Sequence, residues 1–305
     1  MRLVTRADFD GLVCGVLLAE KGVVEEYTFV QPKDVQDGKV EVTKNDVLAN
    51  VPFVPACGMW FDHHVSEVIR LRPDIAFEGA NLPAKSAAQL IWDYYGGEDA
   101  FAQRLRPLLE AVNKSDSGDL TREDITDPRG WMLLSFVVDP RTGLGRFEDF
   151  TIGTEQLMED MIQYCRTKGA EEILEIPDVK QRTARYLEQR PLFEEMLRAH
   201  SRVDGNVIVT DLRPCETTYA GNRFLIFALY PEQNIELRVM WGEDRRDVVF
   251  ACGHSVLNRT SRTNVGALML KHGGGGHDQV GTCRASVDDA ERVCEELIAQ
   301  LHADG

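Results

Sequence analysis

Three groups of acidic and histidine side chains have the residue types and the placement of a metal site. Each follows a segment with the apolar pattern of a strand or a helix, and the groups are Asp8 with Asp10, Asp62 with His63 and His64, and Asp116. Carboxylates and imidazoles together suit Mn²⁺, and Mg²⁺ or another divalent metal is an alternative. A metal held in this way polarises a phosphoryl oxygen and activates water, so the pattern indicates hydrolysis of a phosphoester.

Each group also has an ordinary structural explanation. An Asp-x-Asp pair after a strand often caps the next helix, and Asp116 alone would fit a helix-ending turn. The triplet Asp62-His63-His64 is rarer. Adjacent side chains of an extended strand point to opposite sides, so a structural triplet would need a separate partner for each imidazole.

The surrounding pattern predicts the sheet that would bring these groups together. Short apolar segments occur between helical or polar stretches, at residues 2–5, 27–30, 46–50 and 58–61. Strands that alternate with longer connections predict an α/β fold, in which helices cover both faces of a parallel sheet. Ligands of such sheets bind at the carboxyl ends of the strands, which is where Asp10 and His63 would lie.

The pattern changes after residue 180. Residues 181–201 mix both charges on a helical period and predict a helical connector. Beyond the connector come β-rich runs, a short helix, a glycine-rich loop, a strand and a last helix, with the runs at 206–212, 224–230, 235–241 and 247–252. We therefore expect a metal-binding α/β domain over residues 1–180 and a smaller α+β domain over 202–305.

The glycine-rich loop and the polar residues near it form a candidate phosphate-binding site. Gly273 to Gly276 precede His277, and a glycine backbone can direct successive N–H groups at an anion. Arg259 can donate two hydrogen bonds to one phosphate. A flexible linker is the ordinary explanation of such glycines, but linkers are rare between a helix and a strand of a compact domain. The residues assigned to substrate binding are Asn258, Arg259, Gly274, Gly275, Gly276 and His277.

Composition narrows the class of partner. The chain has 305 residues and a formal net charge of −16, which argues against stable binding of long or duplex nucleic acid. No segment reaches the ~18 uncharged apolar residues of a membrane span. Seven cysteines without CxxC spacing, and no recognisable signal peptide, fit reduced thiols in a cytoplasm. A small phosphorylated substrate or a very short oligonucleotide fits the acidic chain better, and a homodimer stays open.

Together these motifs resemble the DHH superfamily of phosphoesterases. Asp8-Phe-Asp10-Gly, Asp62-His63-His64 and the glycines before His277 occur in the order typical of that superfamily, over nearly the whole chain. The sequence looks most similar to exopolyphosphatase-like members, with the two-domain arrangement of the nanoRNA phosphatases. The resemblance implies a substrate between the domains, metal binding by Asp8, Asp10, His63 and Asp116, catalytic roles for His64 and Asp62, and a phosphate grip by His277 and Arg259.

Two positions depart from the superfamily's pattern. Its first motif commonly has a His or another Asp upstream of the Asp pair, where this chain has Arg6. Its second motif usually supplies a carboxylate that bridges two metals, where this chain has Asn50, and a neutral amide does not bridge two cations in that way. The sequence favours one metal, or a weakly bound pair. A catalytically degenerate regulatory protein that binds a nucleotide or phosphate is the alternative.

Overall fold

The computed structural model describes residues 1–64 and 76–305. The chain forms two compact units, which are Met1–Asp119 with Pro128–Tyr186, and Leu120–Asp127 with Leu187–Gly305. Helix α10 (Pro177–His200) passes from the first unit to the second and contains most of the connector predicted at 181–201. The domain limits proposed from the sequence, 1–180 and 202–305, stay predictions.

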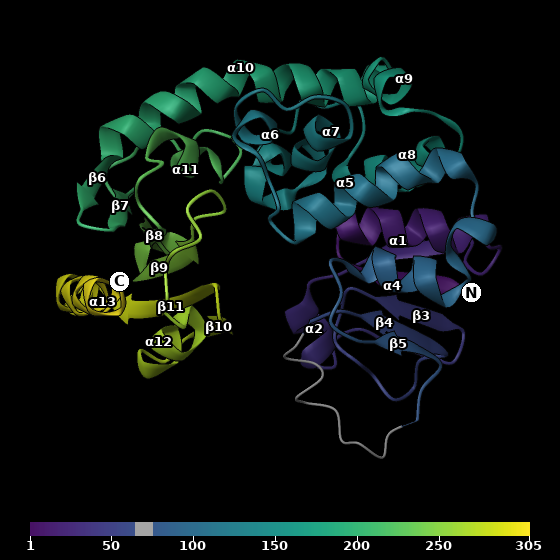
Figure 1. Cartoon of the computed structure of the whole chain (residues 1–305), viewed down its shortest axis with the longest axis horizontal. Coiled ribbons are helices and arrows are strands. Elements are labelled where there is room, and N and C mark those ends of the chain that lie inside the picture. Colours follow the sequence, from purple (N-terminus) through teal and green to yellow (C-terminus); the bar gives the residue numbers. More distant parts are fainter. Residues whose placement is uncertain (65–75) are drawn as a thin grey trace. The chain divides into compact units, whose positions relative to one another are not determined.

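A parallel sheet forms the centre of the first unit, as the sequence predicts (Figure 1). Its five strands lie in the order β2-β1-β3-β4-β5. Each neighbouring pair is parallel, so all the carboxyl ends meet at one edge. The strands are β1 (Arg2–Thr5), β2 (Glu26–Phe29), β3 (Asp46–Ala49), β4 (Met59–Asp62) and β5 (Gly79–Asn81).

Both faces of this sheet are covered, which is why the central strands β1, β3 and β4 are buried along nearly their whole length. Leu3 is fully buried on the side of helix α1, and Val4 packs on the other side with Leu48 and Trp60. In Figure 1, α1 and α4 lie along one face of the sheet and α2 lies on the other. The described helices of the unit are α1 (Phe9–Glu20), α2 (Pro32–Gln36), α4 (Ala87–Tyr94), α5 (Arg106–Asp116), α7 (Gly130–Val138), α8 (Thr154–Thr167) and α9 (Ala170–Leu174), with short 3-10 turns η1 (Gly97–Asp99), η2 (Gln103–Leu105), η3 (Pro140–Thr142) and η4 (Leu144–Arg146).

The second unit contains a mixed sheet of six strands in the order β10-β11-β9-β8-β7-β6. Only the β7–β8 pair is parallel. Helices α12 and α13 contribute to its core through Leu268 and Leu297. The elements are α6 (Arg122–Thr126), β6 (Ser201–Asp204), β7 (Val207–Asp211), α11 (Leu225–Leu229), β8 (Ile235–Trp241), η5 (Glu243–Arg245), β9 (Asp247–His254), α12 (Val265–Lys271), β10 (Gly275–His277), β11 (Val280–Ser286) and α13 (Ala290–Asp304).

One predicted strand of the second unit is wrong. Residues 224–230 read as a β-rich run, but Leu225–Leu229 form helix α11. A short run of apolar residues does not distinguish a buried strand from a buried helix, because neither leaves a polar face in the sequence. Four of the five α11 residues are buried, which accounts for the missing periodicity.

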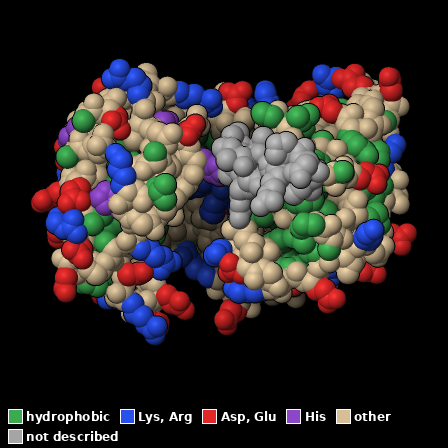
Figure 2. Space-filling view, turned by 90° about the horizontal axis from the view of Figure 1, so that it is seen from below, with side chains coloured by type: hydrophobic (Ala, Val, Ile, Leu, Met, Phe, Trp, Pro, Cys, Tyr) green, Lys and Arg blue, Asp and Glu red, His purple; other side chains and the backbone are tan. Residues whose placement is uncertain are grey.

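The surface carries side chains of both charges. On the face shown in Figure 2, acidic and basic side chains are interspersed over the outer surface of both units. The helices of residues 1–64 and 76–305 are each too short or too polar to span a bilayer.

Candidate metal centre

Asp10, His63 and Asp116 converge at the carboxyl edge of the parallel sheet. One ligand atom from each lies within 4.8 Å of the others. Nε2 of His63 is 3.0 Å from Oδ2 of Asp116 and 3.8 Å from Oδ2 of Asp10. Around an octahedral cation with bonds of about 2.1 Å, neighbouring ligands lie about 3 Å apart and opposite ligands about 4.2 Å apart. The 3.0 Å spacing matches neighbouring ligands, and the 3.8 Å spacing lies between the two values. Of the described residues, this is the one group of three His, Cys, Asp or Glu side chains with such spacing.

Asp10 is held rigidly before any ion binds. The residue lies in the first turn of α1, and its carboxylate faces the start of α4. Oδ2 accepts the backbone N–H of Ala87 at 2.9 Å, and Oδ1 accepts that of Ala88 at 2.9 Å. Ser86 caps the same helix by accepting the N–H of Gln89. The N–H groups of Ala87 and Ala88 fix the orientation of the Asp10 carboxylate, as hydrogen bonds to metal ligands commonly do.

His63 presents the correct nitrogen for a metal. Its Nδ1 lies 3.2 Å from the carbonyl oxygen of Ala84, and a carbonyl can only accept, so Nδ1 carries the hydrogen. The neutral ring then has its lone pair on Nε2. Nε2 is buried and makes no hydrogen bond within the described residues, even though Oδ2 of Asp116 is 3.0 Å away. The arrangement leaves Nε2 suited to a cation.

Burial and the charges that the three side chains exert on one another shift their pKa values. Burial, and then the charge of Asp116, raise the pKa of Asp10 to about 7. Burial lowers the pKa of His63, but contact with Asp116 and the charge of Asp10 outweigh burial and raise it to about 9. Burial opposes ionisation of Asp116, yet His63 holds the pKa of Asp116 below its usual value. A divalent ion would offset the repulsion between Asp10 and Asp116 and would displace bound protons.

His64 lies beside this cluster and is oriented by Asp62. Nδ1 of His64 is 2.7 Å from Oδ1 of Asp62, whose side chain is 1% exposed. The rings of His63 and His64 have centroids 4.5 Å apart. The expectation that the two imidazoles point to opposite sides is therefore wrong, because β4 ends at Asp62 and the chain is no longer extended at the histidines.

Asp8 occupies a different environment from the three converging ligands. Its Oδ1 accepts the N–H of Gly11, which caps α1, and also the amide Nδ2 of Asn50 at 3.0 Å. Its Oδ2 lies 3.3 Å from Nε of Arg6. The structure thus brings Asp10, His63 and Asp116 together, and places Asp8 with the two residues that depart from the superfamily's pattern.

Arg141 was not assigned to the site from the sequence. Arg141 lies in the turn η3, and its side chain is 43% exposed. Its Nε donates to Oδ1 of Asp139 at a distance of 2.7 Å. Burial lowers the pKa of Arg141, but the charges of Asp139, Asp8 and Asp116 outweigh it, and the net shift is upward. The charge of Arg141 therefore acts on the metal site. The only sequence signal was a cation in the segment Asp139-Pro-Arg, which an ordinary turn explains equally well.

The candidate phosphate-binding residues of the second unit have mixed surroundings. Gly275, Gly276 and His277 form β10, an antiparallel partner of β11. A Cβ on Gly274 would lie 2.0 Å from the carbonyl oxygen of Thr282, so close packing requires this glycine. A Cβ on Gly276 would meet β11 backbone in the same way, whereas at Gly275 it would meet nothing within 4 Å.

The two remaining candidates lie on the loop after β9. Nδ2 of Asn258 donates to the carbonyl oxygen of Glu232, and Oδ1 accepts from Thr260. This side chain therefore ties the loop after β9 to the segment between α11 and β8. Arg259 is exposed, with Nε donating to the carbonyl oxygen of Val256.

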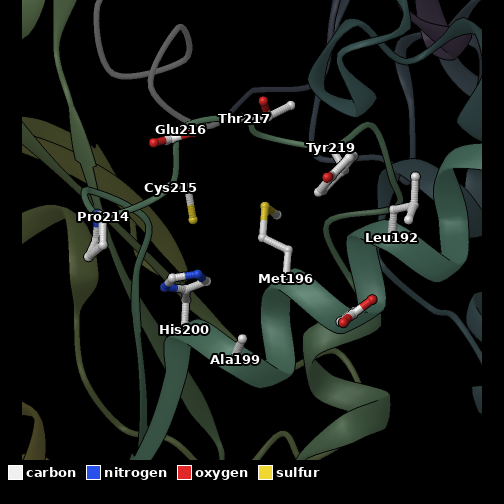
Figure 3. A pocket seen from close by; sticks show the side chains of 10 residues that line it. Leu192, Met196, Ala199, His200, Pro214, Cys215, Glu216, Thr217 and Tyr219 are labelled. Carbon is white, nitrogen blue, oxygen red and sulfur yellow. The ribbon is translucent and has the colours of Figure 1, made fainter.

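A pocket of about 400 Å³ lies elsewhere in the second unit, between the end of α10 and the loop after β7 (Figure 3). Met196 and His200 extend from the helix, opposite Cys215 and Thr217 of the loop. Apolar and polar groups are mixed there, as in many sites for small molecules. The residues that line this pocket do not include Asp10, His63 or Asp116, the group whose spacing could hold a metal ion.

Comparisons with known proteins identify the family. A structure described as a pGpG-specific phosphodiesterase, PggH from Vibrio cholerae, is similar over 100% of this chain and 99% of its own, with 46% identity and a TM-score of 0.87. An exopolyphosphatase-related protein from Bacteroides fragilis has the same fold, with 11% identity, a TM-score of 0.51, and coverage of 98% of this chain and 91% of that chain. No family model and no curated protein matches. With the geometry of the site, the full-length similarity shows that the chain belongs to the DHH superfamily of metal-dependent phosphoesterases.

Proposed function

We propose that the chain hydrolyses the phosphodiester bond of a small 5′-phosphorylated dinucleotide, with pGpG as the first candidate. The observation that carries the proposal is the convergence of Asp10, His63 and Asp116 at the carboxyl edge of the sheet. The substrate class comes from the full-length similarity to a protein described as a pGpG-specific phosphodiesterase. A net charge of −16 also favours a small substrate over a long polyanion.

Mn²⁺ is the proposed ion. Two carboxylates and one imidazole form a ligand set that suits Mn²⁺, and Mg²⁺ would favour an all-oxygen set. When bound, the ion supplies Lewis-acid polarisation of the phosphoryl oxygen and favours ionisation of water. Asp10 contributes through its two backbone hydrogen bonds, which hold its carboxylate in place without reorganisation.

His64 is the proposed proton donor to the leaving oxygen. The hydrogen bond of Nδ1 to Asp62 fixes the ring and assigns proton transfer to Nε2. Asp62 is a positioning residue in this proposal. Its carboxylate also favours the protonated imidazole, which is the form that a general acid needs.

The second unit is proposed to bind a phosphate of the substrate through β10. The absence of a side chain at Gly275 leaves the backbone open to close approach, and packing does not explain that absence. His277 and the exposed Arg259 are proposed to supply positive charge to the same phosphate. Gly274 and Gly276 are explained by packing against β11, and Asn258 by its loop.

A panel of substrates tests the proposed function. The chain would be incubated with pGpG, pApA, a five-residue oligoribonucleotide, phosphoadenosine phosphate and polyphosphate, each with Mn²⁺ and with excess chelator. Chelator-sensitive cleavage of pGpG to GMP, faster than cleavage of the other compounds, is expected. Faster turnover of polyphosphate would replace the dinucleotide with that substrate class. The regulatory alternative predicts binding without cleavage, and the intact set of three ligands argues against it.

A further inference from the structure

Asp8 is saturated by donors that are not metals. Its Oδ1 accepts from Gly11 and Asn50, both at 3.0 Å, and its Oδ2 faces Nε of Arg6 at 3.3 Å. The Asp8 residue is only 4% exposed, so water screens these contacts weakly. A cation that used Asp8 would have to share its carboxylate with Gly11, Asn50 and Arg6.

Asn50 is built into this arrangement by the backbone. It follows β3 with a φ of 56°, in the left-handed region that asparagine tolerates better than most residues. Its N–H donates to the carbonyl oxygen of Phe61, which ties it to β4 beside the histidines. Oδ1 of Asn50 is buried and has no hydrogen-bond partner within the described residues. The side chain thus donates to Asp8 and keeps an acceptor for a further group.

The position of Arg6 suits its guanidinium to binding a phosphate. The guanidinium is 28% exposed and is anchored by one buried carboxylate through Nε. Anchoring through Nε leaves a planar group with further N–H donors in fixed directions, which is the geometry that recognises phosphate. Asp8 caps α1 and Asp10 lies in the first turn of the same helix, so Arg6, which is 3.3 Å from Asp8, lies beside the three converging ligands.

The charge balance of the site favours a cation at this position. Asp8, Asp10 and Asp116 carry one more negative charge than a single divalent ion can neutralise. A phosphodiester would meet a net negative site unless another cation stood beside the ion. Arg6 offsets that excess charge, and the charge of Arg141 acts on Asp8 and Asp116 as well.

We propose that Arg6, paired with the carboxylate of Asp8 that Asn50 holds in place, binds a phosphate oxygen of the substrate beside one metal ion, so that the active site combines a single divalent ion with a fixed guanidinium. This inference rests on the proposed function, because the phosphate belongs to the substrate proposed there. Arg6 is a substrate-binding residue in this account, and Asp8 and Asn50 position it.

Arg2 offers a matched control for Arg6. Both arginines flank β1, both pair through Nε with a buried aspartate, and their side chains are 29% and 28% exposed. Arg2 pairs with Asp46 at the opposite end of the strands from the metal site. Arg2→Gln and Arg6→Gln therefore remove the same kind of ion pair, but only Arg6→Gln removes it from the site.

The test measures metal content and phosphate binding, with no turnover required. Wild type, Arg6→Gln, Arg6→Lys and Arg2→Gln would be loaded with Mn²⁺, assayed for bound manganese by mass spectrometry, and titrated with inorganic phosphate by calorimetry. We expect one Mn²⁺ per chain in all four proteins. Arg6→Gln should weaken phosphate binding roughly tenfold to hundredfold, the loss of about one charge-assisted contact, while Arg6→Lys recovers part of the affinity and Arg2→Gln has none of this effect.

Two results would overturn the inference. One is a second Mn²⁺ bound per chain in the wild type, and the other is phosphate affinity in Arg6→Gln equal to that of Arg2→Gln. The proposed function can fail separately. If pGpG is not cleaved while phosphate binding still depends on Arg6, the substrate assignment is wrong and the role of the arginine stands.

Discussion

Nε2 of His63 lies 3.0 Å from Oδ2 of Asp116, although one residue follows strand β4 and the other ends helix α5. Neither atom gains a hydrogen bond from this approach, because Nε2 has no such partner among the described residues. A close pair of ligand atoms directed at a common point is the arrangement that a cation stabilises.

Removal of His63 should abolish metal binding without unfolding the chain. His63→Ala removes one of three ligands, so Mn²⁺ affinity should fall by more than the ten- to hundredfold typical of changes around a ligand. Calorimetric titration with Mn²⁺ measures the affinity, and circular dichroism checks the fold. His302→Ala, which changes a histidine of α13 in the second unit, is the control. Equal Mn²⁺ affinity in the two variants would remove His63 from the ligand set.

Asp62 should affect turnover and leave the metal in place. Asp62→Asn keeps the shape of the side chain but removes the charge that orients His64 and favours its protonated form. We expect kcat to fall about tenfold to hundredfold, with KM and manganese content near those of the wild type. Asp93→Asn, on the exposed face of α4, serves as the matched change. Loss of bound manganese in Asp62→Asn would instead make Asp62 a metal ligand.

Neighbouring glycines of the second unit should respond differently to alanine. At Gly275 a Cβ meets nothing within 4 Å, so Gly275→Ala should fold normally and raise KM several-fold by blocking close approach of phosphate. Gly274→Ala places a Cβ 2.0 Å from the carbonyl oxygen of Thr282 and should lower the free energy of unfolding by about 1–3 kcal/mol. Urea unfolding and steady-state kinetics separate the effects. An unchanged KM in Gly275→Ala would exclude β10 from substrate binding.

Asp46 should make the stability of the first unit dependent on pH. Its carboxylate is buried and accepts bonds from Arg2 at 2.7 Å and from Thr43 at 2.6 Å. Burial raises the pKa of Asp46, but the bonds from Arg2 and Thr43 outweigh burial, and the net pKa lies below its usual value. The folded-state pKa is thus below the unfolded one, so the stabilisation is present at neutral pH and is lost as pH falls through the folded pKa.

The test compares Asp46→Asn with wild type by urea unfolding at pH 7 and at pH 3. The variant should be less stable by about 1–3 kcal/mol at pH 7, with a smaller difference at pH 3, because the unfolded chain binds the proton more readily than the folded one as pH falls. Asp99→Asn, at an exposed position, should show no such trend. A difference that does not change with pH would assign the effect to packing alone.

The sequence predicted that Asp10 and His63 lie close together because their positions follow from strand ends, and their assignment as metal ligands stays a prediction. Asp10 and His63 follow β1 and β4, and parallel strands bring such positions to one edge. The pairing of Asp8 with Arg6 and Asn50 could not be predicted, since it depends on the register of β1 and β3 and on a left-handed residue after β3. The two hydrogen bonds that hold Asp10 could not be predicted either, because their donors are the backbone N–H groups of Ala87 and Ala88.

The glycines before His277 show a different limit. Four glycines in sequence suggest an open loop, but packing of Gly274 and Gly276 against β11 makes part of the run a strand. Glycine is chosen there for the space it leaves to another backbone, which composition alone does not separate from flexibility. Gly273 and Gly275 both leave open space where a Cβ would be, and of the two only Gly275 lies in β10.

The rate of pGpG cleavage as a function of free Mn²⁺, in protein first stripped of metal, tests the central claim most directly. The account predicts no cleavage without metal and a rate that rises hyperbolically to saturation, as expected for one ion held by Asp10, His63 and Asp116. Cleavage that persists unchanged in the stripped protein with chelator present would contradict it.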